Sequence, residues 1–203
     1  VLDAKKRQIE LRTLPVVAPR ASEVLVKITR ANTFVSDLHM YRGDAFGDFA
    51  PNYQFVMGHE MTGHVLALGE GITTDTRGNR LREGDRVTFS YHRGCGSCPV
   101  CARGQQHACV AALSSVFWDC DKAPHFTGGF ADYYMVRRGQ AVVKLPDEVS
   151  DELAAGCNCA LSQVIQGFKK AGIGVGESVV VQGAGGLGLY ATAVAKAMGA
   201  GQV

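Results

Sequence analysis

The stretch SVVVQGAGGLGLYATAVAKAMGA, Ser178 to Ala200, decides the fold of the second part of the chain. Three consecutive valines between Ser178 and Gln182 are typical of a short buried strand. Glycines follow at once, and apolar residues then recur at helical spacing, at Leu187, Tyr190, Ala191, Val194 and Met198. A strand that passes through a glycine turn into a helix predicts the opening of a parallel α/β domain.

The glycine turn also predicts a nucleotide site. Its residues read GAGGLG, which fits G-x-G-x-x-G in the strand–turn–helix context that this pattern requires. Such a turn brings the backbone close to a pyrophosphate, whose charge then lies at the helix N-terminus. The expected cofactor-binding residues are Gly183, Gly185, Gly186, Leu187 and Gly188. A plain strand–helix turn is the alternative. NAD and NADP are not separated, because the acidic residue that contacts the ribose is expected about 20 residues further on, past Val203.

The character of the sequence changes at Pro146. Before it, short apolar runs bounded by glycine or charged turns predict a β-rich domain, in the form of a partly closed barrel, with strands in 23–29, 63–69, 84–91, 128–136 and 141–146. After it, Ser150 can cap a helix that Gly172 can end. We therefore expect one domain over residues 1–148 and the start of an α/β domain over residues 149–203. One strand and one helix cannot complete a nucleotide-binding sheet, so we expect this second domain to be incomplete.

Composition excludes several classes of protein. The chain has 203 residues, of which 46% are hydrophobic and 20% charged, and its net charge is +2, as in an ordinary soluble globular protein. No basic block is interleaved with aromatic residues, so we expect no nucleic-acid partner. The N-terminal residues are too charged for a signal peptide, and the uncharged run Ser178–Ala195 contains four glycines, which a membrane span would not favour. We expect a cytoplasmic protein with no membrane contact.

Four of the seven cysteines lie close together in the sequence CGSCPVCARGQQHAC. Their spacing, C-x2-C-x2-C-x7-C, can place four thiolates around a tetrahedral zinc at about 2.3 Å each, with no open position for chemistry. The sequence therefore predicts a structural zinc in a reducing compartment, in a lobe over residues 95–109, held by Cys95, Cys98, Cys101 and Cys109. Unliganded cysteines and an iron–sulfur cluster are the alternatives.

Three further places carry groups that can bind a metal or move a proton. His59 and Glu60 are adjacent in GHE, whereas His64 follows on a predicted strand and is interpreted as structural. Helical spacing puts Cys157 on the apolar face of its helix and turns Cys159 toward a cleft or solvent, so Cys159 is the better ligand candidate.

The third place is the sequence ANTFVSDLH. Shortly after Phe34 it carries a hydroxyl, an acid and an imidazole, on Ser36, Asp37 and His39.

Together these pieces resemble the medium-chain dehydrogenase/reductase superfamily, of the zinc-dependent alcohol dehydrogenase type. GHE, the four-cysteine lobe, GGFADYY, NCALSQV and VVVQGAGGLG follow one another in the order that this family has. The resemblance implies a mixed fold: a β-rich GroES-like catalytic domain followed by an α/β Rossmann domain. It also implies hydride transfer between NAD or NADP and a small-molecule alcohol or carbonyl, and assembly as a homodimer or homotetramer.

The resemblance assigns roles to single residues. His59 corresponds to the histidine ligand of a catalytic zinc, Glu60 to its acidic neighbour and Cys159 to the late cysteine ligand. Ser36 corresponds to the hydroxyl that passes a proton to or from the substrate, His39 to the relay to solvent, and Asp37 to the acid that orients the metal-binding histidine.

Phe34 departs from the family pattern, because it stands where the first zinc-binding cysteine is usual, and phenyl cannot bind zinc. Two mechanisms remain open. Either a second zinc binds through His59, Glu60 and Cys159 and polarises the substrate oxygen, or the site works without this metal and Ser36 and His39 supply protons. By analogy with relatives that lack the metal, the second mechanism includes the reduction of conjugated double bonds. A non-catalytic member that binds a nucleotide or a partner is the alternative to an enzyme.

Overall fold

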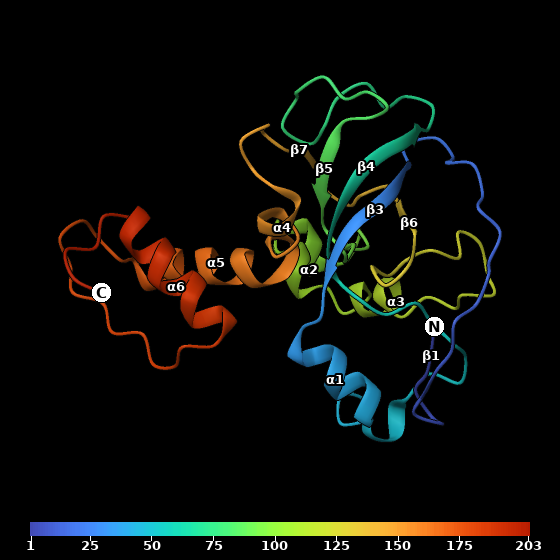
Figure 1. The fold of residues 1–203 in the computed structure, drawn as a ribbon, viewed down its shortest axis with the longest axis horizontal. Helices are drawn as coiled ribbons and strands as arrows, with labels where there is room; N and C mark the ends of the chain where they lie inside the picture. The colour runs from blue at the N-terminus through green and yellow to red at the C-terminus, as the bar shows by residue number, and fades with distance from the viewer.

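The chain folds into a large β-rich body and a smaller helical lobe. The computed structural model describes the backbone of residues 1–203 and all side chains except those of Phe49, Leu113 and Ser114. Figure 1 shows the strands gathered in the large body, with helices α5 and α6 and the C-terminus in the lobe that extends from it. The two parts meet near α4, close to one end of the sheet.

The large body is built on a five-stranded antiparallel sheet with the order β6-β3-β4-β5-β7. Its strands are β3 (Val24–Asn32), β4 (Glu60–Leu68), β5 (Arg86–Phe89), β6 (Tyr133–Val136) and β7 (Val142–Lys144). All five overlap the runs where the apolar pattern predicts strands, with β3 ending three residues later and β4 beginning three residues earlier than predicted, which confirms the β-rich first part. In the described residues β6 and β7 remain the two edges of the sheet, and no pairing between them closes a barrel.

Alternation along the strands produces the main core. Val24 and Val26 of β3 are both fully buried, and they pack with Val65 of β4, Val87 of β5 and Tyr134 of β6. Side chains two apart on a strand face the same side of a sheet, so the period-2 pattern directs these residues inward. The sheet therefore gives a rigid base from which the loops at its ends project.

Shorter elements surround this sheet. A two-stranded ladder joins β1 (Leu2–Asp3) to β2 (Gln8–Ile9), and a second core places Leu2 against Met40 of α1 (Val35–Arg42). The cysteine lobe and the segments near it contribute only short turns of helix: η1 (Gly47–Phe49), α2 (Pro99–Ala102), η2 (Gln106–Ala108) and α3 (Ala112–Val116).

The helical lobe follows a broken path. Ser150 accepts a hydrogen bond from the Leu153 amide, at 3.3 Å, at the start of this region. Gly172, in a left-handed conformation with φ 71°, ends the helix that stops at Ala171. Both predicted caps are confirmed. Between these caps the chain forms three elements instead of one continuous helix. They are α4 (Asp151–Ala154), the π-helix η3 (Cys157–Leu161) and α5 (Ser162–Ala171).

The predicted strand from Ser178 to Gln182 is wrong as a regular element. The structure has one isolated parallel bridge, Ser178 to Gln202, with hydrogen bonds from Val179 N to Gln202 O and from Gly201 N to Glu177 O. A strand needs neighbours along its length, and residues 201–203 supply only a short one. The parallel direction of this bridge and the helix α6 (Gly186–Ala197) agree with the incomplete α/β domain expected from the sequence.

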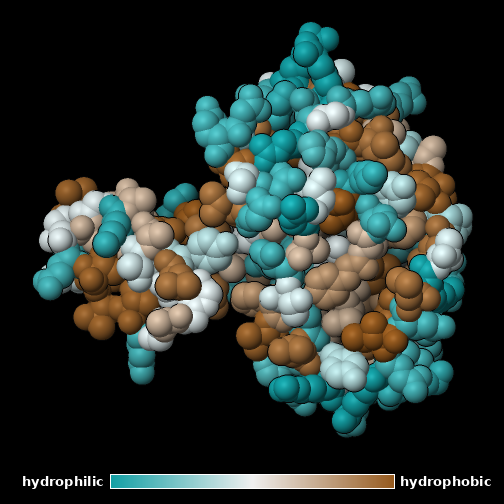
Figure 2. Space-filling view, viewed as in Figure 1, coloured by the Kyte–Doolittle hydropathy of each residue, from teal (hydrophilic) through white to brown (hydrophobic). Residues whose placement is uncertain are grey.

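Several apolar side chains of the small lobe remain exposed. Val175, Val180 and Leu189 keep 88%, 95% and 65% of their surface accessible. Figure 2 shows brown, apolar residues on this lobe, and also on the large body, where teal residues dominate the upper and lower ends. A single strand and helix cannot cover both of their apolar faces. Among the described residues, no helix is long and apolar enough to cross a membrane.

Candidate functional site

The first turn of α1 brings two of the predicted side chains, Ser36 and Asp37, to His59. The helix begins directly after β3, and Phe34 is its N-cap residue. The Oδ2 atom of Asp37 accepts a hydrogen bond from the Phe34 amide at 2.8 Å, so Asp37 satisfies a backbone donor that the helix leaves unpaired. This bond fixes the turn that carries Ser36.

His59 lies between two of these residues. Its Nε2 atom is 3.4 Å from the Oγ atom of Ser36, and its Nδ1 atom is 3.4 Å from the Oδ1 atom of Asp37. Both His59 and Asp37 are buried, with 6% and 2% of their surface exposed. Ser36, His59 and Asp37 thus form one row of polar groups, called here the Ser36–His59–Asp37 row.

The charge around His59 favours its protonated form. Burial of the ring opposes ionisation, but the Asp37 carboxylate and the Cys159 sulfur outweigh it and raise the pKa of His59 to about 9. The Asp37 contact matters most among the favourable ones, because a carboxylate next to an imidazole stabilises the imidazolium.

Two aromatic rings enclose His59. The Phe34 ring meets the imidazole edge-on, with ring centroids 5.7 Å apart and an interplanar angle of 89°. The Tyr91 ring lies 5.0 Å away at 60°. Sequence analysis missed Tyr91. The available signal was its position at the end of the predicted strand run 84–91; in the structure β5 ends at Phe89, and Tyr91 follows it.

Cys159 and Glu60 are held by contacts of their own. The Cys159 Sγ atom accepts from Gln163 Nε2 at 2.7 Å and from the Tyr91 hydroxyl at 3.8 Å. The Glu60 carboxylate accepts from the Ala160 amide at 2.7 Å and from the Cys159 amide at 3.4 Å. Burial raises the pKa of Glu60, although these amides oppose the shift.

The π-helical turn η3 explains the burial of its two cysteines. Helical spacing predicts a core position for Cys157 and a cleft or solvent position for Cys159. Cys157 is instead half-buried, whereas Cys159 is 4% exposed and lines a cavity, so it faces a cleft and not solvent. A π turn holds more residues than an α turn and so changes which side each residue faces. Asn158, which sequence analysis also missed, anchors the turn by accepting from the Met61 amide at 3.2 Å.

The three residues predicted to hold a catalytic metal do not form a metal-binding group. A metal needs at least three ligand atoms from His, Cys, Asp or Glu close together. Among the described residues, the four lobe cysteines meet this condition, with all their ligand atoms within 4.8 Å of one another. His59, Glu60 and Cys159 do not. Phe34, which stands where the family has its first cysteine ligand, has no lone pair with which to bind a metal. The donors present around His59 therefore do not fit a metal ion.

The two other histidines that the sequence singled out, His39 and His64, make contacts outside the Ser36–His59–Asp37 row. His39 is exposed, and its Nδ1 atom is 3.5 Å from Asp44 Oδ2 instead of facing Ser36. The Nδ1 atom of His64 lies 3.1 Å from the backbone oxygen of Gly84, which agrees with a structural role.

A cavity of about 900 Å³ lies beside α5, next to the Ser36–His59–Asp37 row. Tyr91, Cys159 and Gln163 are among its lining residues, and no member of the row is. Tyr91 and Cys159 therefore contact both His59 and the cavity, and Gln163 contacts Cys159.

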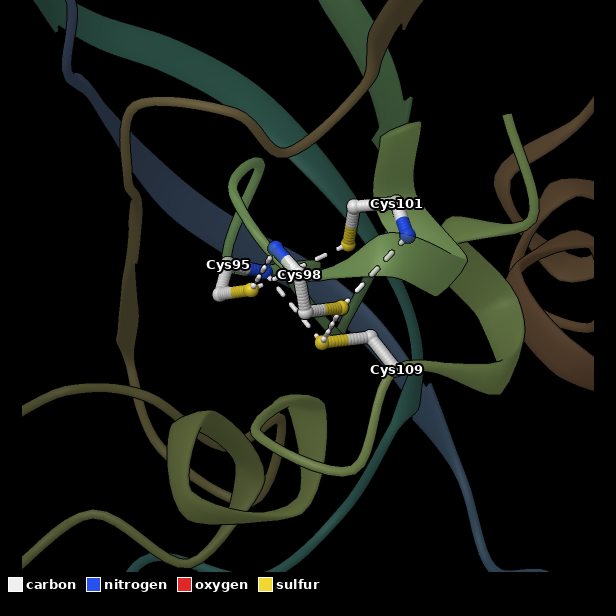
Figure 3. A group of neighbouring side chains, drawn as sticks. All are labelled: Cys95, Cys98, Cys101 and Cys109. Atoms are coloured by element: carbon white, nitrogen blue, oxygen red, sulfur yellow. Dashed lines mark hydrogen bonds between the residues drawn. The ribbon is translucent and has the colours of Figure 1, made fainter. Parts of the chain in front are cut away.

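The four cysteines of the lobe converge as the sequence predicts them to. Figure 3 shows the four sulfur atoms pointing toward one another, and their ligand atoms all lie within 4.8 Å. Backbone amides turn toward the sulfurs: the Cys98 amide donates to Cys95 Sγ at 3.3 Å, and the Cys95 amide to Cys109 Sγ at 3.4 Å. Such donors stabilise thiolates, so this set of four sulfurs fits a tetrahedral zinc.

Proton affinities differ within this group. Amide hydrogen bonds from Ser97 and Cys98 lower the pKa of Cys95 to about 6. The Gly96 amide favours the thiolate of Cys101, but burial and the neighbouring thiols outweigh it and raise the pKa of Cys101 to about 12. Four sulfurs this close cannot all ionise without a cation among them.

The glycine turn has three geometrically distinct positions. Gly183 has φ 99°, a conformation that favours glycine. A Cβ atom at Gly188 would lie 1.9 Å from the Gly183 oxygen, whereas one at Gly185 would meet nothing within 4 Å. Gly183 thus permits the turn, Gly188 permits close packing of α6 against it, and the space at Gly185 is open for a ligand.

The antiparallel sheet, the cysteine lobe and the glycine turn, in this order, define a chain of the medium-chain dehydrogenase/reductase class. Residues 20–147 match the alcohol dehydrogenase GroES-like domain, and the chain belongs to this family. It is 32% identical to 5-exo-hydroxycamphor dehydrogenase of Pseudomonas putida, over 97% of the chain and 53% of that protein. It is 33% identical to acryloyl-coenzyme A reductase of Metallosphaera sedula, over 98% of the chain and 55% of that protein.

A solved structure gives the same fold. Acetophenone reductase of Geotrichum candidum, in complex with NAD, superposes with a TM-score of 0.74 at 31% identity, over 96% of this chain and 53% of that one. The chain spans about half the length of the curated relatives that it matches.

Proposed function

We propose that this chain belongs to an NAD(P)-dependent oxidoreductase that transfers hydride between a nicotinamide cofactor and an alcohol or carbonyl, or a conjugated double bond. One observation carries the proposal: the helix of the glycine turn packs directly against the π-helical turn beside His59. A Cβ atom at Gly156 would lie 2.1 Å from the Tyr190 hydroxyl of α6. This packing connects a nucleotide turn with a cluster of polar groups through Cys159, which lies three residues after Gly156.

The glycine turn would hold the cofactor. The N-terminus of α6 presents unpaired backbone amides, and the open space at Gly185 lets a pyrophosphate approach them. The similarity to a reductase solved with NAD supports a nicotinamide dinucleotide as the ligand. Leu187 is 41% exposed within the same turn and would contact the bound nucleotide.

When bound, the nicotinamide supplies or accepts one hydride, while the substrate oxygen or carbon gains or loses one proton. The chain contributes the groups that bind and orient the substrate. Ser36 presents a hydroxyl at the N-terminus of α1, and His59 and Asp37 hold this hydroxyl in place. His39 is exposed on the same helix, where it can exchange a proton with solvent.

The cysteine lobe would hold a zinc ion with a structural role. Cys95, Cys98, Cys101 and Cys109 fill all four tetrahedral positions, which leaves none for substrate. Such a zinc would fix the loop between β5 and α3 and take no part in hydride transfer.

The relatives suggest which substrates to test first. One is named for a hydroxycamphor, a secondary alcohol, and one for acryloyl-coenzyme A, whose double bond is conjugated to a carbonyl. The test is the absorbance of the reduced nicotinamide, measured with the full-length protein, both cofactors, and panels of alcohols, aldehydes, ketones and enones. We expect turnover with at least one class.

The non-catalytic alternative predicts a different result. A protein that binds the cofactor with a measurable Kd but turns over no member of the panels would contradict the proposal. Gly185→Ala serves as a control, because a methyl group in the open space should weaken cofactor binding while the fold remains.

A further inference from the structure

Phe34 is built into the structure as part of the helix start. Its amide donates to Asp37 Oδ2, its ring stacks edge-on against His59, and its backbone conformation is extended, as an N-cap requires. The phenyl ring therefore lies against the imidazole where the family pattern has a thiol, and it offers no ligand atom to a metal.

Each remaining donor already has a partner from this chain. On His59, Ser36 faces Nε2 and Asp37 faces Nδ1, each at 3.4 Å. An acid at Nδ1 is compatible with a metal at Nε2, so the contact that a metal would replace here is the one with Ser36. The Glu60 carboxylate faces two backbone amides, and these contacts also hold the π-helical turn. A metal ion would have to replace several of these contacts at once.

Gln163 provides independent support. Its side-chain amide donates to Cys159 Sγ at 2.7 Å, and the Tyr91 hydroxyl points to the same sulfur. These donors fix the position of the sulfur from the side of α5. Among the described residues, the ligand atoms of Cys159, His59 and Glu60 do not all lie within 4.8 Å of one another.

We propose that the site around His59 binds no metal ion, and that the Ser36–His59 pair makes the contact with the substrate oxygen that a metal would otherwise make. This inference rests on the proposed function for its substrate, but its claim about the metal does not. Ser36 is then the catalytic residue, and His59 and Asp37 are positioning residues.

Metal content tests the first part without any assay of activity. The full-length protein, prepared with excess zinc and then desalted, should contain one zinc per chain by mass spectrometry. After exchange with cobalt(II), its visible spectrum should show only a tetrathiolate site. Two zincs per chain, or cobalt bands of a mixed nitrogen–sulfur site, would overturn the inference and leave the proposed function intact.

Two variants of one residue sharpen this result. Phe34→Cys supplies the missing thiol, and we expect it to raise the zinc content from one toward two per chain. Phe34→Leu is the matched control, since it removes the ring but adds no ligand, and it should stay at one. A second zinc in Phe34→Leu would mean that only the ring blocks a complete site, and this would contradict the assignment of the other donors.

The second part is tested at Ser36. We expect Ser36→Ala to lower kcat about a hundredfold with a much smaller change in KM and no change in zinc content. Ser36→Thr keeps the hydroxyl and should retain most of the rate. If Ser36→Ala has the wild-type kcat, the hydroxyl does not contact the reacting oxygen and this part of the inference fails.

Discussion

The Oδ1 atom of Asp37 lies 3.4 Å from the Nδ1 atom of His59, and both side chains are buried at the start of α1 and β4. The other oxygen of the same carboxylate caps the helix by accepting from Phe34. One side chain therefore fixes a helix terminus and orients an imidazole, which makes Asp37 the residue whose replacement should have the clearest effect on this site.

Asp37→Asn should lower the pKa of His59 from about 9, because the amide removes the negative charge and its single oxygen cannot accept from both Phe34 and His59. Because the pKa of His59 is raised in the folded state, protonation of His59 stabilises the fold. This stabilisation is complete below the unfolded pKa of about 6.5 and is lost as the pH rises through the folded pKa of about 9. We expect the variant to lose about 1–2 kcal/mol at pH 6 and less above pH 9. Urea unfolding at both pH values and an NMR titration of His59 measure this.

Asp44→Asn is the control for that experiment. Asp44 lies beside the exposed His39 and not beside His59, so its replacement should leave the His59 titration unchanged. An equal shift in both variants would mean that the general charge of the protein, and not the Asp37 contact, sets the pKa.

Without metal, the lobe cysteines should react with iodoacetamide in a fixed order. At pH 7 the Cys95 thiol, which is exposed and has a pKa of about 6, should be alkylated first, and the buried Cys101, with a pKa of about 12, last. Peptide mapping by mass spectrometry reports the order. Addition of zinc beforehand should protect all four cysteines; continued alkylation of Cys95 at saturating zinc would contradict a four-sulfur site.

Two glycines of the same helix should respond differently to a methyl group. In Gly188→Ala the new Cβ would lie 1.9 Å from the Gly183 oxygen, so the turn must move, and we expect a loss of about 1–3 kcal/mol and weaker cofactor binding. Gly186→Ala meets nothing within 4 Å and should keep or slightly raise stability. Thermal unfolding and cofactor Kd measure both, and similar losses in the two variants would contradict the steric argument.

Asp75 should be important for the loop before β5. It is buried and accepts hydrogen bonds from the amides of Arg77, Asn79 and Lys144, at 2.8–3.0 Å. Asp75→Ala should therefore destabilise the fold by about 2–4 kcal/mol in urea unfolding. The exposed Asp147→Ala should change stability by less than about 0.5 kcal/mol.

The same carboxylate gives a pH dependence. Burial raises the pKa of Asp75, but the amide and Asn79 hydrogen bonds outweigh it and hold the pKa below its usual 3.8. A lowered pKa stabilises the fold above 3.8, and this contribution is lost as pH falls through the folded value. Asp75→Ala should therefore unfold at a higher pH than the wild-type protein on acid titration. An unchanged acid midpoint would show that Asp75 is not the limiting carboxylate.

Local sequence determined much of this fold. The alternation of apolar residues predicted the five strands, and the caps Ser150 and Gly172 bounded the helical region, because both signals depend on neighbours in sequence. The spacing of the lobe cysteines likewise predicted their convergence, since short turns bring near residues together. These features need no knowledge of distant contacts.

The rest depends on contacts between distant residues. The π-helical turn forms where Glu60 accepts from amides about a hundred residues later, and helical periodicity carries no sign of this. Ser36 meets His59 across 23 positions, and Tyr91 approaches both His59 and Cys159 from the segment that follows β5. The expected strand after Ser178 needed partner strands that a single bridge does not replace.

The π-helical turn Cys157–Leu161 makes the number of residues in this part of the chain matter as much as their identity. An α-helix turns by about 100° per residue, and a π turn contains one residue more than the α turn it replaces. Removal of one codon in this turn would restore the α-helical count and rotate α5 by about that angle. A single-residue deletion here would therefore reorient the smaller lobe against the sheet, whereas a substitution at the same place would alter one side chain.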